Sequence, residues 1–308
     1  MLNNTQTILH KKNKHKNGYN FDNLRATNKD LEPFVFTNTH GTQTIDFAKP
    51  DAVRALNTTL LKAHYTISHW DFPKVNLCPP IPGRVEYIHY MADLLKMPKP
   101  NTNIKVLDIG TGASCIYPLL GNAEYDWQFV ATDISEGSLA SAQKIVEKNK
   151  LNDAISFRLQ RNSANIFKGI LRENDAFSLS ICNPPFYKNE AEAFEATTRK
   201  LKGLGKLTDT VVRNFAGTAQ ELWFEGGEKA FLHTYLYESS LYKKQCVWYS
   251  SLVSNKAHVK SMQASLKKLN AETVKVITMP MGNKVSRVVA WTFFTDEELK
   301  AAIKNNYK

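Results

Sequence analysis

From residue 104 onward, short apolar runs alternate with amphipathic stretches of helical length. This alternation is the sequence signature of βαβ units on a parallel sheet. We expect strands at 104–109, 127–132, 155–159, 177–182, 246–252, 274–279 and 288–294, and helices at 114–121, 136–149, 163–173, 228–243 and 256–269. The segment from Pro280 to Lys284 is too short for a parallel crossover and forces the last two strands into an antiparallel pair. The pattern predicts an α/β fold with a Rossmann-like sheet.

The part of the chain before residue 98 has a different pattern. The segment 50–65 predicts a helix, because Pro50 suits the first helical position and apolar residues recur there at helical spacing. A second helix follows the Pro-rich turn at 78–83 and ends before Pro98.

We therefore divide the chain into an N-terminal extension, residues 1–97, and a sheet domain, residues 98–308. Within the sheet domain, residues 188–227 combine mixed charge, several glycines and weak periodicity. These features predict a long mobile loop.

The charge of the chain indicates its class of partner. The 308 residues include 40 Lys and Arg against 29 Asp and Glu, a formal net charge of +11. Such an excess attracts polyanions, so nucleic acid is the first partner to consider and an acidic membrane surface the second. No run of eighteen apolar residues exists, and residues 1–16 are polar and basic, so we expect neither a membrane span nor a secretory signal.

The cysteines give no sign of a metal site. Cys78, Cys115, Cys182 and Cys246 lie far apart, and none forms a CxxC pair or stands at zinc-like spacing to a histidine. We interpret them as reduced packing residues of a cytoplasmic protein.

A glycine-rich turn follows the first of the predicted strands. Residues 104–109 run into Gly110-Thr111-Gly112-Ala113-Ser114, where glycines let the backbone approach a ligand at the carboxyl end of the sheet. The next strand ends in Asp133, from which a carboxylate can accept hydrogen bonds from both hydroxyls of a ribose. The turn lacks the third glycine of the dinucleotide fingerprint. That counts against NAD and favours S-adenosylmethionine, which has no pyrophosphate.

The tetrapeptide Asn183-Pro184-Pro185-Phe186 directly follows the predicted strand 177–182. Its prolines stiffen the backbone and carry no N–H that competes for carbonyl groups. The Asn183 side-chain oxygen and the Pro184 carbonyl can then accept both hydrogens of a planar exocyclic amine. This steers the nitrogen lone pair toward a methyl-bearing sulfonium without a strong base. Phe186 offers a face on which an extruded base can stack.

The glycine-rich turn, Asp133 and this tetrapeptide together resemble the amino-methylating class I methyltransferases, which modify adenine, cytosine or glutamine nitrogen. Longer strings, at 51–57, 82–89, 107–121 and 224–228, look like the methyltransferase-16/ribosomal RNA methyltransferase F family, and those at 69–73 and 77–84 resemble its bacterial branch. The resemblance runs from His10 to Thr295.

It implies a Rossmann-like class I S-adenosylmethionine-dependent methyltransferase with a seven-stranded sheet and an N-terminal helical RNA-binding extension. The implied reaction is methylation of the exocyclic N6 of one adenine in 23S ribosomal RNA.

The resemblance also implies the cofactor ligands: Gly110, Gly112, Ser114 and Asp133, with Arg84 at the cofactor carboxylate and Asn162 at its adenine. Arg84 stands just inside a helix start, where the helix dipole disfavours a cation, and this supports a functional role. The eukaryotic branch carries Glu where Asp133 stands, and either carboxylate can bind a ribose.

A basic arm, residues 10–16, precedes every acidic residue of the chain. Its cations and the following Tyr19 and Phe21 suit single-stranded or looped RNA, and a solvated, frayed terminus is the alternative. The RNA contacts that we expect are His10, Lys11, Lys12, Asn13, Lys14 and Lys16. We expect a monomer whose partner is 23S ribosomal RNA or a large-subunit assembly intermediate.

Two other functions stay open at this point. A protein-glutamine N5 methyltransferase acting on a release factor shares the Asn-Pro-Pro core, but such proteins usually carry Tyr where Phe186 stands and need no basic arm. A non-catalytic RNA-binding or ribosome-assembly factor on a decayed methyltransferase fold is the other possibility. The intact Gly110, Asp133 and 183–186 argue against decay.

Overall fold

The computed structural model describes residues 9–96, 103–189, 191–192, 195, 223–281 and 284–305. Within these residues, one seven-stranded sheet has the order β5-β4-β3-β6-β7-β9-β8. Its strands are β3 (Lys105–Ile109), β4 (Gln128–Asp133), β5 (Ile155–Leu159), β6 (Phe177–Cys182), β7 (Cys246–Val253), β8 (Thr273–Met281) and β9 (Lys284–Thr292). β9 runs antiparallel to both of its neighbours, and the other pairs are parallel. The predicted α/β fold and its terminal antiparallel hairpin are confirmed.

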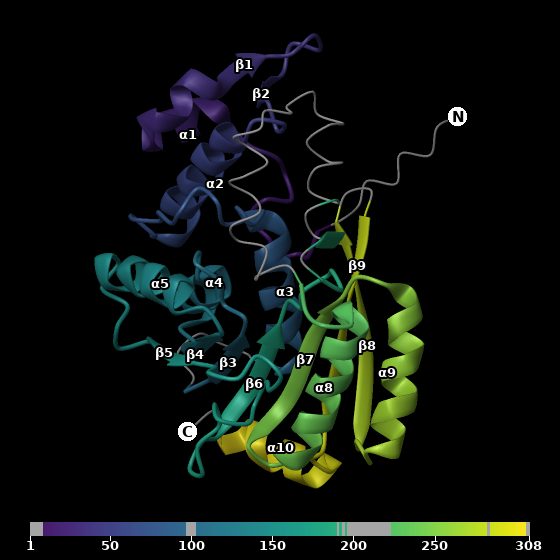
Figure 1. Ribbon diagram of the computed structural model, residues 1–308. Helices are drawn as coiled ribbons and strands as arrows, with labels where there is room; N and C mark the ends of the chain where they lie inside the picture. Colours follow the sequence, from purple (N-terminus) through teal and green to yellow (C-terminus); the bar gives the residue numbers. More distant parts are fainter. Residues whose placement is uncertain are drawn as a thin grey trace.

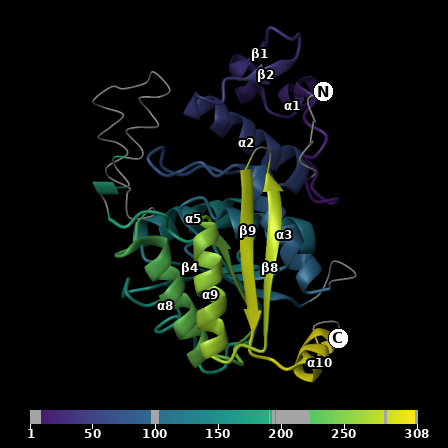
Figure 2. The ribbon, with the colours of Figure 1, turned by 90° about the vertical axis from the view of Figure 1, so that its right-hand side faces the viewer.

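Helices cover both faces of this sheet (Figures 1 and 2). On one face lie α8 (Gly227–Leu241) and α9 (Lys256–Lys268), and on the other α3 (Ile81–Leu94), α4 (Ile116–Tyr125) and α5 (Glu136–Lys148). Each layer has its own buried apolar cluster, so the sheet is sandwiched between two cores. A further helix, α10 (Asp296–Asn305), follows β9.

The sheet order places the site. The chain passes from β3 outward to β4 and β5 and then returns to β6 on the opposite side of β3. In such sheets ligands bind in the crevice outside the carboxyl ends of the strands where the order reverses. That crevice lies between β3 and β6 here.

The helix expected at 163–173 does not form, so this prediction is wrong. The segment 160–176 consists of turns, and remote side chains bind its backbone. The Glu238 carboxylate accepts hydrogen bonds from the consecutive N–H groups of residues 166–168, at 2.6–3.2 Å. Those N–H groups therefore follow a path set by α8 rather than a helical one.

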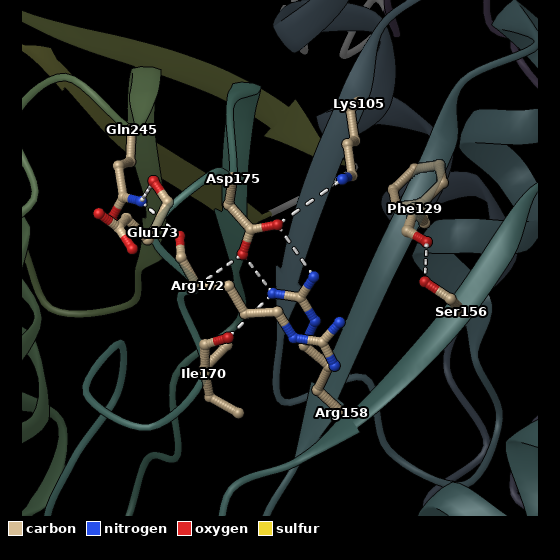
Figure 3. A network of polar contacts seen from close by, with 9 residues as sticks. All are labelled: Lys105, Phe129, Ser156, Arg158, Ile170, Arg172, Glu173, Asp175 and Gln245. Atoms are coloured by element: carbon tan, nitrogen blue, oxygen red, sulfur yellow. Dashed lines mark hydrogen bonds and ion pairs between the residues drawn. The ribbon is translucent and has the colours of Figure 1, made fainter.

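A polar network fixes the rest of this segment to the sheet (Figure 3). The Arg158 guanidinium donates to the Ile170 carbonyl at 2.9 Å and to both carboxylate oxygens of Asp175. Lys105 Nζ lies 3.8 Å from the same carboxylate, and Gln245 donates to the Arg172 carbonyl at 2.6 Å. The network joins β3, β5 and the loop before β7.

The N-terminal part lies above the carboxyl edge of the sheet (Figure 1). It contains α1 (Phe21–Thr27), the 3₁₀ helix η1 (Lys29–Phe34), β1 (Val35–Thr37), β2 (Gln43–Ile45) and α2 (Pro50–Tyr65). The bounds predicted for α2 are confirmed, with Pro50 first and the left-handed Thr66 (φ 59°) ending the helix. The pattern analysis did not predict α1 or the β1–β2 hairpin.

The division of the chain at residue 97 stays a prediction. Helix α3, which falls within the predicted extension, packs against the sheet, and one apolar cluster runs from Leu24 and Leu56 through Ile88 to Val106. Most of the loop expected at 188–227 lies outside the described residues.

Among the described residues, no helix is long and apolar enough to cross a membrane. The four cysteines are free thiols, and Cys115, Cys182 and Cys246 are buried, as we expected of packing residues.

Candidate active site

The glycine-rich turn leaves β3 in a left-handed conformation. Gly110 has φ 73° and Gly112 has φ 64°, values that favour glycine. The N–H groups of Gly110 and Thr111 donate to the Thr132 carbonyl, at 3.0 and 2.9 Å, and so tie the turn to β4. A Cβ added at Gly110 would meet nothing within 4 Å. The turn therefore borders open space at the carboxyl edge of the sheet.

Asp133 lies beside this turn at the end of β4. One carboxylate oxygen accepts from the Gly112 N–H and the other from the Ser135 N–H, both at 2.9 Å. Burial raises the pKa of this carboxyl group, and the backbone hydrogen bonds oppose that shift. Each oxygen can accept a second hydrogen bond. Asp133 is therefore held in place with acceptor capacity left for a ligand.

Asp108 is the residue of this site that pattern analysis did not assign. It lies fully buried within β3, and neither carboxylate oxygen has a hydrogen-bond partner among the described residues. Burial raises its pKa to about 7; the nearby Thr111 side chain and Arg84 oppose the shift, and Asp133 adds to it. An unpartnered buried carboxylate is costly without a ligand. An acid in the middle of an apolar strand was the sequence signal that could have identified it.

Arg84 lies in the first turn of α3, as predicted. Its Nη1 donates to the Tyr117 hydroxyl at 2.9 Å, whereas its buried Nε has no partner among the described residues. The guanidinium is thus fixed by α4 and lies close enough to Asp108 to oppose the rise in the pKa of that carboxyl group.

Trp70 supports the turn from the N-terminal part. Its indole N–H donates to the Ser114 carbonyl at 2.9 Å, and the side chain is buried. The string at 69–73 that marked the bacterial branch therefore packs on the glycine-rich turn. Sequence reasoning gave Trp70 no role.

The tetrapeptide 183–186 lies next to the glycine-rich turn. Ile109 of β3 pairs with Cys182 of β6, so Gly110 and Asn183 leave the sheet side by side. Pro184 is buried, whereas the Phe186 side chain is 44% exposed. No described residue hydrogen-bonds to the Asn183 side-chain amide. Within the part of the chain that the structure describes, the site thus presents an unpaired amide acceptor and an exposed aromatic ring at the carboxyl edge of β3 and β6.

The residues after the tetrapeptide are held by the segment just before α8. The Phe224 N–H donates to the Tyr187 carbonyl at 3.0 Å. Gly226 and Gly227 are both left-handed, and a Cβ on Gly227 would lie 2.9 Å from Lys188 Cγ. Gly227 therefore allows α8 to approach the residues that follow the tetrapeptide closely.

Asn162 lies on the turn segment after β5 rather than before a helix. It is exposed; its N–H donates to Gln160 Oε1 and its side chain accepts from the Ala164 N–H, each at 3.0 Å. Its contact with the cofactor adenine stays a prediction.

The basic arm is anchored and not frayed. The His10 N–H and the Asn13 side chain donate to the two carboxylate oxygens of the fully buried Glu86, each at 2.7 Å. His10 and Asn13 are themselves buried, and the His10 ring lies 3.0 Å from a carboxylate oxygen of Asp93. Contacts of these two residues with RNA stay a prediction.

The lysines of the arm differ in whether they pair with a carboxylate. Lys14 Nζ lies 2.8 Å from a carboxylate oxygen of Glu124. Lys11, Lys12 and Lys16 are exposed and have no carboxylate partner within the described residues. These three lysines lie close together in the chain, on an arm whose backbone is anchored to Glu86.

Comparisons with known proteins agree with this geometry. A sequence profile described as "RNA methyltransferase" matches residues 3–295. Ribosomal RNA large subunit methyltransferase F of Flavobacterium psychrophilum is 46% identical over 303 residues, 96% of each chain. The enzyme of the same name from Colwellia psychrerythraea is 49% identical over 298 residues, covering 93% of this chain and 99% of that one.

Solved structures of RNA methyltransferase domains are also similar to this chain. The catalytic domain of human METTL16 in complex with hairpin 1 of the MAT2A 3′ UTR has a TM-score of 0.79 at 31% identity, over 94% of this chain and 96% of that one. The N-terminal domain of human METTL16 in complex with SAH has a TM-score of 0.75 at 29% identity, over 93% and 99%. The profile, the relatives and the structures all span nearly the whole chain, and the chain belongs to this family of RNA methyltransferases.

Proposed function

We propose that this protein transfers a methyl group from S-adenosylmethionine to the exocyclic N6 amine of one adenine in 23S ribosomal RNA. The observation that carries the proposal is the position of Asn183-Pro184-Pro185-Phe186, which leaves β6 beside the glycine-rich turn of β3. The names of the bacterial relatives support a large-subunit ribosomal RNA as the substrate.

The buried polar groups of the site fit S-adenosylmethionine. The amino-acid end of this cofactor carries an ammonium and a carboxylate, and the unpartnered Asp108 and Arg84 Nε match these two charges. Asp133 offers acceptors for the ribose hydroxyls, and the open space at Gly110 leaves room for the nucleoside between them. The human relative solved with SAH, the demethylated form of the cofactor, supports this assignment.

The residues of the loop perform the chemistry on the target base. When bound, S-adenosylmethionine supplies an electrophilic methyl group on a sulfonium. The Asn183 side-chain oxygen and the Pro184 carbonyl accept the two amine hydrogens, which turns the nitrogen lone pair toward the methyl carbon. The amine nitrogen gains the methyl group, the sulfur keeps the bonding electrons, and the nitrogen releases one proton to water. The exposed Phe186 ring stacks on the base.

The basic arm binds the RNA in this proposal. Lys11, Lys12 and Lys16 contact phosphates, with Lys14 beside them, and their positions are fixed by His10 and Asn13 on Glu86. His10 and Asn13 thus act by anchoring the arm. The reaction takes place in the cytoplasm, on 23S ribosomal RNA or on a large-subunit assembly intermediate.

The test uses ribosomal RNA from cells that lack the gene. Purified protein is incubated with isotopically labelled S-adenosylmethionine and, in separate reactions, naked 23S RNA, large-subunit particles or a release factor. Modified nucleosides and amino acids are identified by mass spectrometry. We expect N6-methyladenosine at one position in one of the two RNA substrates. Label in a release-factor glutamine instead would support the protein-methylating alternative, and no label in any substrate would contradict both.

A further inference from the structure

Strands β6 and β7 stop pairing before either of them ends. Their register joins Phe177 with Cys246 and ends at Ser180 with Tyr249, although β6 continues to Cys182. On its other side, β6 pairs with β3 as far as Cys182. The strand end that carries Asn183 therefore has a neighbouring strand on one side only.

The side chain of Tyr87, from α3, occupies the place where β7 no longer pairs. Its hydroxyl lies 3.4 Å from the Cys182 backbone nitrogen, which donates to it, and 2.8 Å from Ser250 Oγ. Ser250 Oγ in turn donates to the Ser180 carbonyl at 2.7 Å. Tyr87, Ser180 and Ser250 are all fully buried.

The donor count fixes the direction of these hydrogen bonds. Because the Ser250 proton is used on the Ser180 carbonyl, Tyr87 donates its own proton to Ser250 Oγ and accepts from the Cys182 N–H. Every polar atom of this group is thereby satisfied, and a buried N–H left without its acceptor would be costly. The tyrosine hydroxyl takes the place of a missing strand partner.

Tyr235, from α8, makes a matched contact on the opposite face of the sheet. Its hydroxyl donates to the Ser250 carbonyl at 3.1 Å and accepts from Ser180 Oγ at 2.7 Å. Tyr235 is fully buried as well. Its hydrogen bonds to described residues go to Ser180 and Ser250, and none of them reaches Cys182.

We propose that Tyr87 is a positioning residue for methyl transfer, because its hydroxyl holds the Cys182 amide and so sets the position of Asn183. The inference rests on the proposed role of Asn183. A displaced acceptor would misalign the amine lone pair, and misplacements of about 1 Å can cost on the order of a hundredfold in rate. Tyr87 lies one helical turn from Arg84 on α3, so one helix supports both the cofactor side and the catalytic loop.

The experiment compares Tyr87→Phe with Tyr235→Phe in the full-length protein. Each variant removes one buried hydroxyl from the same two serines, so we expect both to lower the melting temperature. Only Tyr87→Phe should lower kcat, by about tenfold or more, while its KM for the RNA substrate and its Kd for S-adenosylmethionine stay within about twofold of wild type. A kcat within about twofold of the Tyr235→Phe value would overturn the proposal.

Two further measurements keep the proposal testable. Amide hydrogen exchange at Cys182 and Asn183, relative to the rest of β6, should be faster in Tyr87→Phe than in Tyr235→Phe. Equal exchange in the two variants would overturn the positioning role, whether or not the wild-type protein methylates RNA. A wild-type protein that methylates no RNA would instead refute the proposed function. If Tyr87→Phe does not fold, Ser250→Ala replaces it, since Ser250 Oγ orients the Tyr87 hydroxyl, and an unchanged kcat would then refute the positioning role.

Discussion

At the scale of single residues, the candidate site is marked by three polar side chains near the ends of buried elements. Asp108 and Arg84 keep unpartnered polar atoms inside the protein, while Asp133 is held by two backbone N–H groups. The sequence predicted Asp133 as a ribose ligand from its spacing to the glycine-rich turn, and the family resemblance implied Arg84. It did not identify Asp108, because the burial of an acid follows from the layers on both faces of β3.

The substitution Asp108→Asn should stabilise the cofactor-free protein. The pKa of Asp108 is raised from 3.8 to about 7, so ionised Asp108 destabilises the fold, and this cost grows as the pH rises from 3.8 to 7. Removing the charge should recover at most about 4 kcal/mol above pH 7. We expect a higher melting temperature without cofactor and a smaller increase on adding S-adenosylmethionine. Calorimetry at pH 5 and pH 8 checks both; a lower melting temperature at pH 8 would contradict this account.

Asn183→Ala should abolish turnover and leave cofactor binding nearly intact. The Asn183 amide makes no hydrogen bond to a described residue, so its loss removes an acceptor for the target amine and no structural bond. Isothermal titration with S-adenosylmethionine and a methylation assay measure the two properties. A loss of cofactor affinity equal to the loss of rate would place Asn183 in the cofactor site alone.

At the level of elements, the sequence pattern predicted those helices and strands whose formation depends on residues close to them in the chain. Pro50 and the apolar spacing gave α2 its bounds, and the short Pro280–Lys284 segment gave the terminal hairpin. The helix predicted at 163–173 failed because Glu238, about seventy positions away, binds the backbone there. The anchoring of the arm depends on Glu86, which is equally remote in sequence.

Docking of the arm on α3 should weaken in acid. Burial lowers the pKa of His15 and of His89 to about 3; neighbouring cations add to the shift, and His10 stacks on His89 at 5.1 Å. Both folded pKa values lie below the unfolded value of 6.5, so their neutral forms are favoured in the fold. The contribution of the two neutral histidines to the free energy of unfolding is fully present above pH 6.5. It is lost as the pH falls toward 3, by about 2 kcal/mol for each histidine at pH 5.

Denaturant unfolding of wild type and of His89→Gln between pH 5 and 8 measures this effect. We expect the variant to lose less stability than wild type between pH 7 and pH 5, even if it is less stable at pH 7. Parallel pH profiles would show that His89 does not resist protonation.

For the whole molecule, α1 and α2 lie above the carboxyl edge of the sheet, while α10 and the end of α9 lie at the opposite edge (Figures 1 and 2). The arm lies on the helix layer, against α3 and the end of α4. This arrangement allows a matched comparison: Lys11, Lys12 and Lys16 in the arm against the exposed Lys267, Lys268 and Lys300 at the other edge. Changing each set to Gln removes the same charge from the chain.

If the arm lysines contact phosphates, the arm variant should release fewer counterions on binding. Its plot of log affinity against log salt should be less steep than that of wild type, by at most about 0.7 for each lost contact with a single strand. The control variant should keep the wild-type slope, because long-range attraction between exposed charges is screened within about 8 Å at physiological ionic strength. S-adenosylmethionine affinity should stay unchanged in both. Equal slopes for the two variants would assign RNA binding to net charge alone, and the anchored arm would then serve only to cover α3.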